Sequence, residues 1–376
     1  MSKKRVLLAG GAVLGVVALG AAYLSVDDIT SGAAKKVVQE WEQSLPEGKS
    51  FTYASLSASA GGTVTFEDPV YTTDQDGAQV EFRADRMVAS GFSVDSGTVR
   101  EIGNVEWDNG RIRAANTGDT LTTGSGSLSD LVIAADGTPR RIGGGVVSDF
   151  DMAADGSELR IAEMTLEGTE DHVYDVEIAD LSVANAKSRS RGQMFDRVDV
   201  GSFSASGLAL GPLDAFAEKA KQEGVDGEFA IDRKVDGEVS LRDMKAFSGD
   251  REIGHLGELD AVYGPEGHSG YAVDLTFADN GARFPEQSTR MSGFHNILFA
   301  QLRDMGYDSL SSSGRYAVYF DEANGVFEIR NFNIQVDDMA AFEMSAAFSG
   351  MPKVDRDAVE DRPQALMKEA SQVRLD

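Results

Sequence analysis

Apolar and polar side chains alternate along much of the chain after residue 50, and this pattern predicts β-strands. A period of two places every second side chain on one face of a strand, so that one face is apolar and the other polar. The clearest alternating segments lie near residues 51–53, 64–66, 80–84, 105–112 and 316–344. The sequence therefore predicts a mainly β protein with an elongated antiparallel sheet whose two faces differ in polarity.

Turn signals separate these segments. Asp-Gly and Asn-Gly pairs favour tight hairpins because both residues accept a positive φ. We expect one hairpin across Val105–Ile112 and another between Tyr316 and Ile329. The pairs begin at Asp76, Asn109, Asp136, Asp155, Asp226, Asp236, Asn280 and Asn324.

The apolar phase slips by one residue at two places. Beyond Ile329 the next residue expected to face the apolar side is Asn331, but the apolar residues continue one position later, at Phe332. A similar slip follows Ala84, since Met87 resumes out of phase. A slip of one residue is typical of a β-bulge, and repeated bulges bend a sheet. The predicted sheet is therefore bulged and curved, like a trough or a taco.

Helical periodicity interrupts the strands at a few places. An amphipathic helix is expected within residues 29–50, and two covering helices are expected near 212–223 and 285–305, the latter capped by Gly306. Residues 351–376 are expected to form a C-terminal tail or helix, with residues 363–373 as the helical part.

The N-terminal segment, residues 1–28, has the charge pattern of an exported protein. Lys3, Lys4 and Arg5 precede an uncharged run from residue 6 to residue 26, which acidic residues then close. The pattern fits a transmembrane anchor in the inner membrane, and the small residues near Gly20 also fit a cleaved signal segment. Both interpretations place the rest of the chain in the periplasm.

The chain of 376 residues is longer than one compact core accommodates, so we expect it to be divided. The predicted parts are an N-terminal β-rich region, 51–210, and a C-terminal β-rich region, 211–350. Two basic, glycine- and serine-containing stretches, 140–145 and 187–192, are candidate boundaries between smaller strand modules.

Composition excludes several classes of function. The 62 acidic and 35 basic residues give a formal net charge of -27, which opposes nucleic-acid binding. The absence of cysteine removes thiolate nucleophiles, disulfides and iron–sulfur clusters. The four histidines lack metal-ligand spacing, and we find no catalytic motif, metal site or cofactor-binding motif.

The remaining candidate is an apolar groove along one sheet face. It is either an ordinary closed core or a surface left open for acyl chains. Its candidate residues are Val64, Phe66, Val80, Phe82, Val105, Trp107, Tyr316, Val318, Phe320, Phe327, Ile329, Phe342 and Met344.

Two segments, 51–70 (FTYASLSASAGGTVTFEDPV) and 305–350, together with the N-terminal segment, resemble the AsmA-like envelope proteins and their uncharacterised proteobacterial relatives. The resemblance implies a membrane anchor, a trough-shaped periplasmic sheet and a role in moving lipids between membranes. It implies no catalytic residue. This chain is shorter than typical AsmA-like proteins.

The sequence thus leads to one function and two alternatives. We expect a non-enzymatic periplasmic protein that shelters or relays lipid acyl chains along an apolar sheet face. The first alternative is a scaffold subunit that binds other envelope proteins and no lipid. The second is a secreted carbohydrate-active enzyme, which needs two carboxylates converging in a cleft.

Overall fold

A computed structural model of the chain describes residues 48–59, 62–75, 78–95, 98–115, 118–133, 139–154, 157–168, 173–185, 195–209, 236–284, 300–321, 323–350 and 374–375. Within these residues the protein is mainly β and its paired strands are antiparallel, as the alternating pattern predicts. The strands belong to two compact units, which are described separately.

The division between the units falls earlier than residue 210. Unit 1 holds the described residues of Met1–Arg189, and unit 2 holds those of Ser190–Leu208 and Ile231–Asp376. The basic stretch 187–192 lies outside the described residues. Strand β15 (Arg197–Ala209) lies almost wholly in unit 2.

Unit 1 is built from two ladders of paired strands that meet at one strand. The first ladder runs β2, β3, β6, β7, β10 and β12, and the second runs β1, β4, β5, β8, β9 and β12. Strands β13 and β14 continue from β12, and β11 pairs with the end of β10. The strands are β1 (Lys49–Thr52), β2 (Ser55–Ala58), β3 (Val64–Glu67), β4 (Val70–Gln75), β5 (Ala78–Arg83), β6 (Arg86–Asp95), β7 (Thr98–Asp108), β8 (Arg111–Ala114), β9 (Thr120–Thr122), β10 (Ser125–Ile133), β11 (Pro139–Arg141), β12 (Gly144–Ala154), β13 (Ser157–Gly168) and β14 (Val173–Asn185).

The two ladders enclose the hydrophobic core of unit 1. Phe51 of the second ladder meets Phe66 of the first edge to face, with ring centroids 5.3 Å apart. Phe82 and Val105 are 3% and 1% exposed and belong to the same buried cluster. Packing between two layers removes apolar surface from water on both sides, which is the main force that holds such an arrangement closed.

The predicted hairpin across Val105–Ile112 is wrong. β7 pairs with β6 and β10, whereas β8 pairs with β5 and β9. Asn109, with φ 52°, instead turns the chain from one ladder into the other. The apolar residues on both sides of Asn109 alternate as in a hairpin, because those of β7 and β8 face the same core from opposite layers. Periodicity alone does not distinguish this arrangement from a hairpin.

The same kind of corner explains the slip after Ala84, which is not a bulge. β5 belongs to the second ladder and β6 to the first, so the chain changes layer at Ala84 and Asp85. The amide of Asp68 donates to the carbonyl of Asp85, and the amide of Asp85 donates to the carbonyl of Asp108. The corners of neighbouring strands are therefore hydrogen-bonded side by side.

Aspartates with positive φ occur inside several strands. Asp130, Asp149, Asp180, Asp243 and Asp279 have φ values between 49° and 54°. Asp and Asn adopt this left-handed conformation more readily than most other residues with a side chain. Each aspartate therefore interrupts the extended backbone of its strand at one position.

A small residue faces each interruption on a neighbouring strand. In β12 and β13, Ser148 pairs with Glu163 and Phe150 with Ile161, which leaves Asp149 opposite Ala162. The register is the same on both sides, so no residue is inserted. In both strands the inward-facing residues change from odd to even positions, or the reverse, at this point. The apolar side chains therefore stay on the same face of the sheet on both sides of the interruption.

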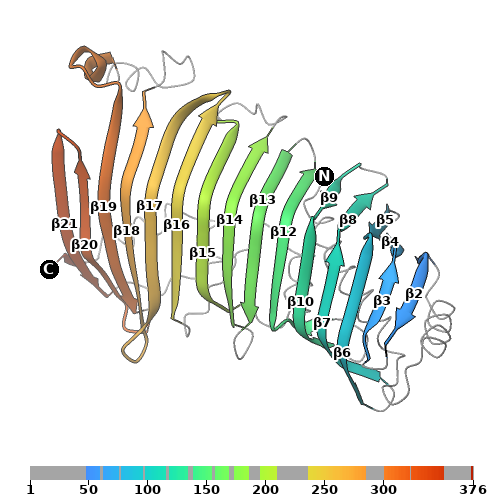
Figure 1. Ribbon diagram of the computed structural model, residues 1–376. Coiled ribbons are helices and arrows are strands. Elements are labelled where there is room, and N and C mark those ends of the chain that lie inside the picture. The colour runs from blue at the N-terminus through green and yellow to red at the C-terminus, as the bar shows by residue number, and fades with distance from the viewer. Residues whose placement is uncertain are drawn as a thin grey trace. The chain divides into compact units, whose positions relative to one another are not determined.

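Unit 2 is an open up-and-down sheet in which each strand pairs with the next (Figure 1). The hairpin at Asn324-Gly325 is confirmed, since Asp321 pairs with Val326. The register shift between Ile329 and Phe332 confirms the predicted bulge. The strands are β15, β16 (Gly237–Ser248), β17 (Arg251–Glu266), β18 (Gly270–Arg283), β19 (Ser309–Asp321), β20 (Val326–Val336), β21 (Ala340–Ser349) and β22 (Arg374–Leu375).

Two further turn predictions have different outcomes. The strands on both sides of Asp155-Gly156 pair as a hairpin, because Ala154 lies opposite Ser157. Asn280, in contrast, lies within β18, where it pairs with Leu256 and Ser312, so the predicted turn there is wrong. Asn280 follows Asp279, whose left-handed conformation bends the strand without ending it.

Of the predicted helix 285–305, the structure describes only the end, where residues 300–304 are helical. The predicted cap is confirmed, since Gly306 has φ 96°. The amide of Gly306 donates to the carbonyl of Arg303, and the amide of Tyr307 donates to the carbonyl of Leu302. This is the Schellman arrangement. The helix predicted within residues 29–50 lies outside the described residues up to residue 47, and its last two residues belong to strand β1. The predicted helices 212–223 and 363–373 lie outside the described residues.

The predicted membrane anchor, residues 6–26, also lies outside the described residues. Among the residues that are described, no helix combines the length and hydrophobicity that a membrane crossing requires.

Candidate functional site on unit 2

Six of the thirteen predicted groove residues lie in the closed core of unit 1. They are at most 9% exposed, and side chains of both ladders cover them. They therefore contribute to the stability of unit 1 and present no surface to a ligand in this structure. These residues are Val64, Phe66, Val80, Phe82, Val105 and Trp107.

The other seven come together on one face of unit 2. Directly opposed residues of antiparallel strands point to the same side of a sheet. Val318 lies opposite Ile329, and Phe320 lies opposite Phe327, which in turn lies opposite Phe348. The bulge at Arg330 restores the phase, so the apolar side chains remain on one side through β20. The seven residues are Tyr316, Val318, Phe320, Phe327, Ile329, Phe342 and Met344.

The apolar face is wider than the thirteen candidate residues indicated. On β18, alternate residues from Tyr271 to Phe277 pair with the apolar residues of β19. Their period of two is visible in the sequence, but nothing local shows that β18 lies next to β19. We use the name apolar face for Tyr271, Val273, Leu275, Phe277, Tyr316, Val318, Phe320, Phe327, Ile329, Phe332, Ile334, Phe342, Met344 and Phe348.

Aromatic contacts connect the strands across this face. The ring centroids of Tyr271 and Phe320 are 5.3 Å apart, and Phe332 lies 5.8 Å from both Tyr316 and Phe342. Such spacing is typical of stabilising aromatic pairs. The rings pack beside one another within the sheet, which leaves their outer surfaces available for other contacts.

The apolar face is not fully covered by the protein. Val318 and Tyr271 are buried, but most of the other members are only half-buried. Phe342 and Met344, at its outer strand, are 55% and 38% exposed. Exposed apolar surface of this extent is uncommon on a soluble protein and typically marks a contact with a ligand or a partner.

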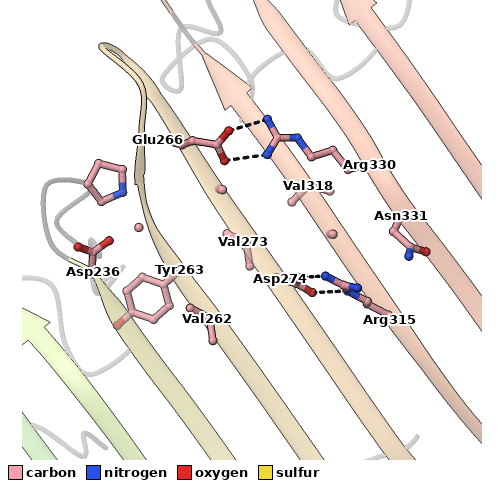
Figure 2. A pocket seen from close by; sticks show the side chains of 14 residues that line it. Asp236, Val262, Tyr263, Glu266, Val273, Asp274, Arg315, Val318, Arg330 and Asn331 are labelled. Atoms are coloured by element: carbon pink, nitrogen blue, oxygen red, sulfur yellow. Dashed lines mark hydrogen bonds and ion pairs between the residues drawn. The ribbon is translucent and has the colours of Figure 1, made fainter.

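The opposite face of the same strands is polar and contains a hollow of about 530 Å³ (Figure 2). Its floor includes the small residues Gly264, Ala272 and Ala317. The carboxylate of Asp236 lies close to Gly264, since a side chain there would begin 2.0 Å from Asp236 Oδ1.

Two ion pairs border this hollow (Figure 2). Arg330 donates to both carboxylate oxygens of Glu266 at 2.7 and 2.9 Å, and its guanidinium lies 4.5 Å from the ring centre of Tyr319. Arg315 donates through Nε to Asp274 at 2.8 Å, and its Nη2 donates to the second oxygen. The first pair connects β17 with β20 across the two strands between them.

The ion pairs shift the pKa values of their members. Hydrogen bonds from Arg330 lower the pKa of Glu266, and hydrogen bonds from Arg315 lower the pKa of Asp274. The same contacts raise the pKa of both arginines. Both carboxylates therefore stay ionised at neutral pH, and the pairs tie neighbouring strands together.

The described residues contain no cluster of three or more His, Asp or Glu side chains arranged for a metal ion. His255 contacts Glu252 through Nδ1 at 3.1 Å and Asp279 through Nε2 at 3.3 Å. These are contacts between partly exposed side chains near the start of β17 and on the neighbouring β18.

Comparison with models of known protein families gives no match, and comparison with curated proteins gives none.

Proposed function

We propose that the protein is a non-enzymatic envelope protein that shelters or relays lipid acyl chains along the apolar face of unit 2. The observation that carries the proposal is the contrast between the two units. The six candidate groove residues of unit 1 are at most 9% exposed between two ladders, whereas Phe342 and Met344 of unit 2 are 55% and 38% exposed.

The chemistry of the apolar face fits a hydrocarbon chain. Its members are aliphatic and aromatic side chains, and each buried CH₂ group of a ligand contributes about 0.8 kcal/mol. Affinity would then increase with acyl-chain length and depend little on the head group. The acidic body of the protein, with a net charge of -27, would be repelled by anionic lipid surfaces.

The proposal includes the location inferred from the sequence. Residues 6–26 would anchor the chain in the inner membrane, and the two β units would lie in the periplasm, where lipids pass between membranes. The basic residues before this segment and the acidic residues after it support that orientation.

Photocrosslinking tests the proposal on the full chain. A fatty acid with a diazirine group near the middle of its chain is added to the purified protein, and labelled peptides are mapped by mass spectrometry. We expect labelling of β20 and β21, and little labelling of the buried strands of unit 1.

A matched pair of variants locates the binding. Phe342→Glu places a charge on the apolar face, whereas Val262→Glu places one on the polar face at nearly the same exposure, 54% against 55%. Phe342→Glu is expected to reduce labelling by about tenfold, and Val262→Glu to leave it unchanged, because only the first charge must be desolvated by a bound chain. Absence of labelling, or equal labelling in both variants, would refute acyl-chain binding and favour a scaffold protein without lipid.

A further inference from the structure

Among the described residues, the outer strand of unit 2 has an edge without a strand partner for most of its length. β21 pairs with β20 from Ala340 to Phe348. On the other side, among the described residues, only β22 pairs with it, and only at Phe348 and Ser349. All residues from Ala340 to Ser345 are exposed.

This edge lacks the features that usually prevent strand addition. Proteins protect exposed edges with lysine, proline, bulges or very short strands. β21 has ten residues, AAFEMSAAFS, with Glu343 as its single charged side chain and no proline. The bulge of this hairpin lies in β20 and leaves β21 regular from Ala340 to Met344. Among the described residues, none pairs with the outer edge of β21 between Ala340 and Ala347, so this edge offers its backbone groups to another strand.

β22 shows that the edge accepts an antiparallel strand. Leu375 lies opposite Phe348, and Arg374 lies opposite Ser349. The six exposed residues that precede this pairing have the same strand conformation. An incoming segment would continue the ladder that β22 begins.

The side chains of β21 specify what the incoming segment must present. Phe342 and Met344 extend the apolar face to the edge, where Phe342 packs against Phe332. On the polar face, Glu343 lies opposite Asn333. Alternate side chains of an added strand would therefore lie beside the apolar pair and beside the carboxylate.

Charge selects the kind of partner. Glu343 and the turn residues Asp337 and Asp338 are exposed and acidic, whereas the nearby Arg330 is already paired with Glu266 and Glu328. A second copy would bring another net charge of -27 to the contact. A basic segment is favoured over a second copy, because complementary charge speeds encounter and like charge opposes it.

We propose that β21 is a docking edge for an extended segment of another protein, which pairs with Ala340–Ala346 through backbone hydrogen bonds. The segment would alternate apolar residues, beside Phe342 and Met344, with basic residues, beside Glu343. This interaction does not require a bound lipid, since its hydrogen bonds are made by the backbone edge of β21.

The test uses the full chain and three synthetic peptides. The first peptide alternates lysine and valine over ten residues, the second has glutamate in place of lysine, and the third has the lysine sequence with alternate backbone nitrogens methylated. Binding is measured by fluorescence anisotropy, and hydrogen exchange reports which amides become protected.

We expect the lysine peptide to bind about tenfold more tightly than the glutamate peptide. It should slow exchange in β21 and leave β17 unchanged. The methylated peptide keeps the charge but loses the hydrogen bonds, so its binding should be lost. E343K should weaken the lysine peptide and strengthen the glutamate peptide.

Three results would overturn the proposal. Equal binding of the methylated peptide would mean that charge alone attracts the peptides. Unchanged exchange in β21 would place the contact elsewhere. Protection of β21 that increases with protein concentration, without any peptide, would assign the edge to a second copy of the chain.

Discussion

The carboxylate of Asp149 occupies the space in which a side chain on Gly124 would stand. A Cβ atom at Gly124 would lie 2.6 Å from Asp149 Oδ2, and the amide of Gly124 donates to the carbonyl of Ser148. Asp149 adopts φ 49°, which turns its side chain towards the neighbouring strand. The left-handed residue and the glycine are therefore a matched pair at the position where the two ladders of unit 1 meet.

This pairing predicts a coupled effect of two substitutions. Gly124→Ala should lower the free energy of unfolding by roughly 1–3 kcal/mol, because the new methyl group collides with Asp149. Asp149→Gly should have a small effect, because relief of the left-handed conformation is offset by the greater entropy of the unfolded chain.

In the background of Asp149→Gly, the substitution Gly124→Ala should lower the free energy of unfolding by less than about 1 kcal/mol, since the aspartate side chain no longer occupies the space of the new methyl group. Urea unfolding, followed by the fluorescence of Trp107 in a Trp41→Phe background, gives the free energy of unfolding of the unsubstituted protein, the two single variants and the double variant. Additive effects of the two substitutions would show that the residues do not compete for one space.

The difference between the closed core and the apolar face predicts unequal costs for the same substitution. Phe82→Ala, at a residue 3% exposed, should destabilise unit 1 by about 3–5 kcal/mol through lost burial and a cavity. Phe342→Ala, at a residue 55% exposed, should cost less than about 1 kcal/mol, because its main loss is the contact with Phe332.

Denaturant unfolding of the two variants gives both values. The comparison is matched, because the same atoms are removed from a strand in each case. A large cost for Phe342→Ala would indicate that this side chain is buried in solution and would contradict the open apolar face.

The ion pair of Arg315 and Asp274 predicts a pH-dependent contribution to stability. The pKa of Asp274 is lower in the folded protein than the usual value of about 3.9 in an unfolded chain. Its contribution is therefore fully present above that unfolded value and is lost as the pH falls through the folded pKa. Because both side chains are substantially exposed, the contribution should be at most about 1 kcal/mol.

Asp274→Asn should consequently lower the urea midpoint at pH 7 and have no effect near pH 2. High salt should reduce the difference at pH 7, since it screens exposed charges. The control is Asp151→Asn, which removes the carboxylate of another exposed pair, with Arg160, in unit 1. If the urea midpoints with and without Asp274→Asn differed by the same amount at all pH values, the effect would come from packing and not from the charge of Asp274.

Several parts of the fold could be predicted from the sequence because they depend on neighbouring residues. Alternation of polarity predicts strands, and Gly325, with φ 63°, supplies the left-handed conformation that its hairpin needs. Gly306 ends a helix for the same reason. The slip between Ile329 and Phe332 reveals a bulge, since one extra residue must shift the phase.

The tertiary structure decided which strands are neighbours and which apolar surfaces are covered. Asn109-Gly110 has the same local pattern as a hairpin, but it turns the chain between two layers. Phe82 and Phe342 lie in similarly alternating segments, yet the first is buried and the second is exposed. Alternation gives each strand an apolar side, but only the packing of distant segments determines whether another layer covers it.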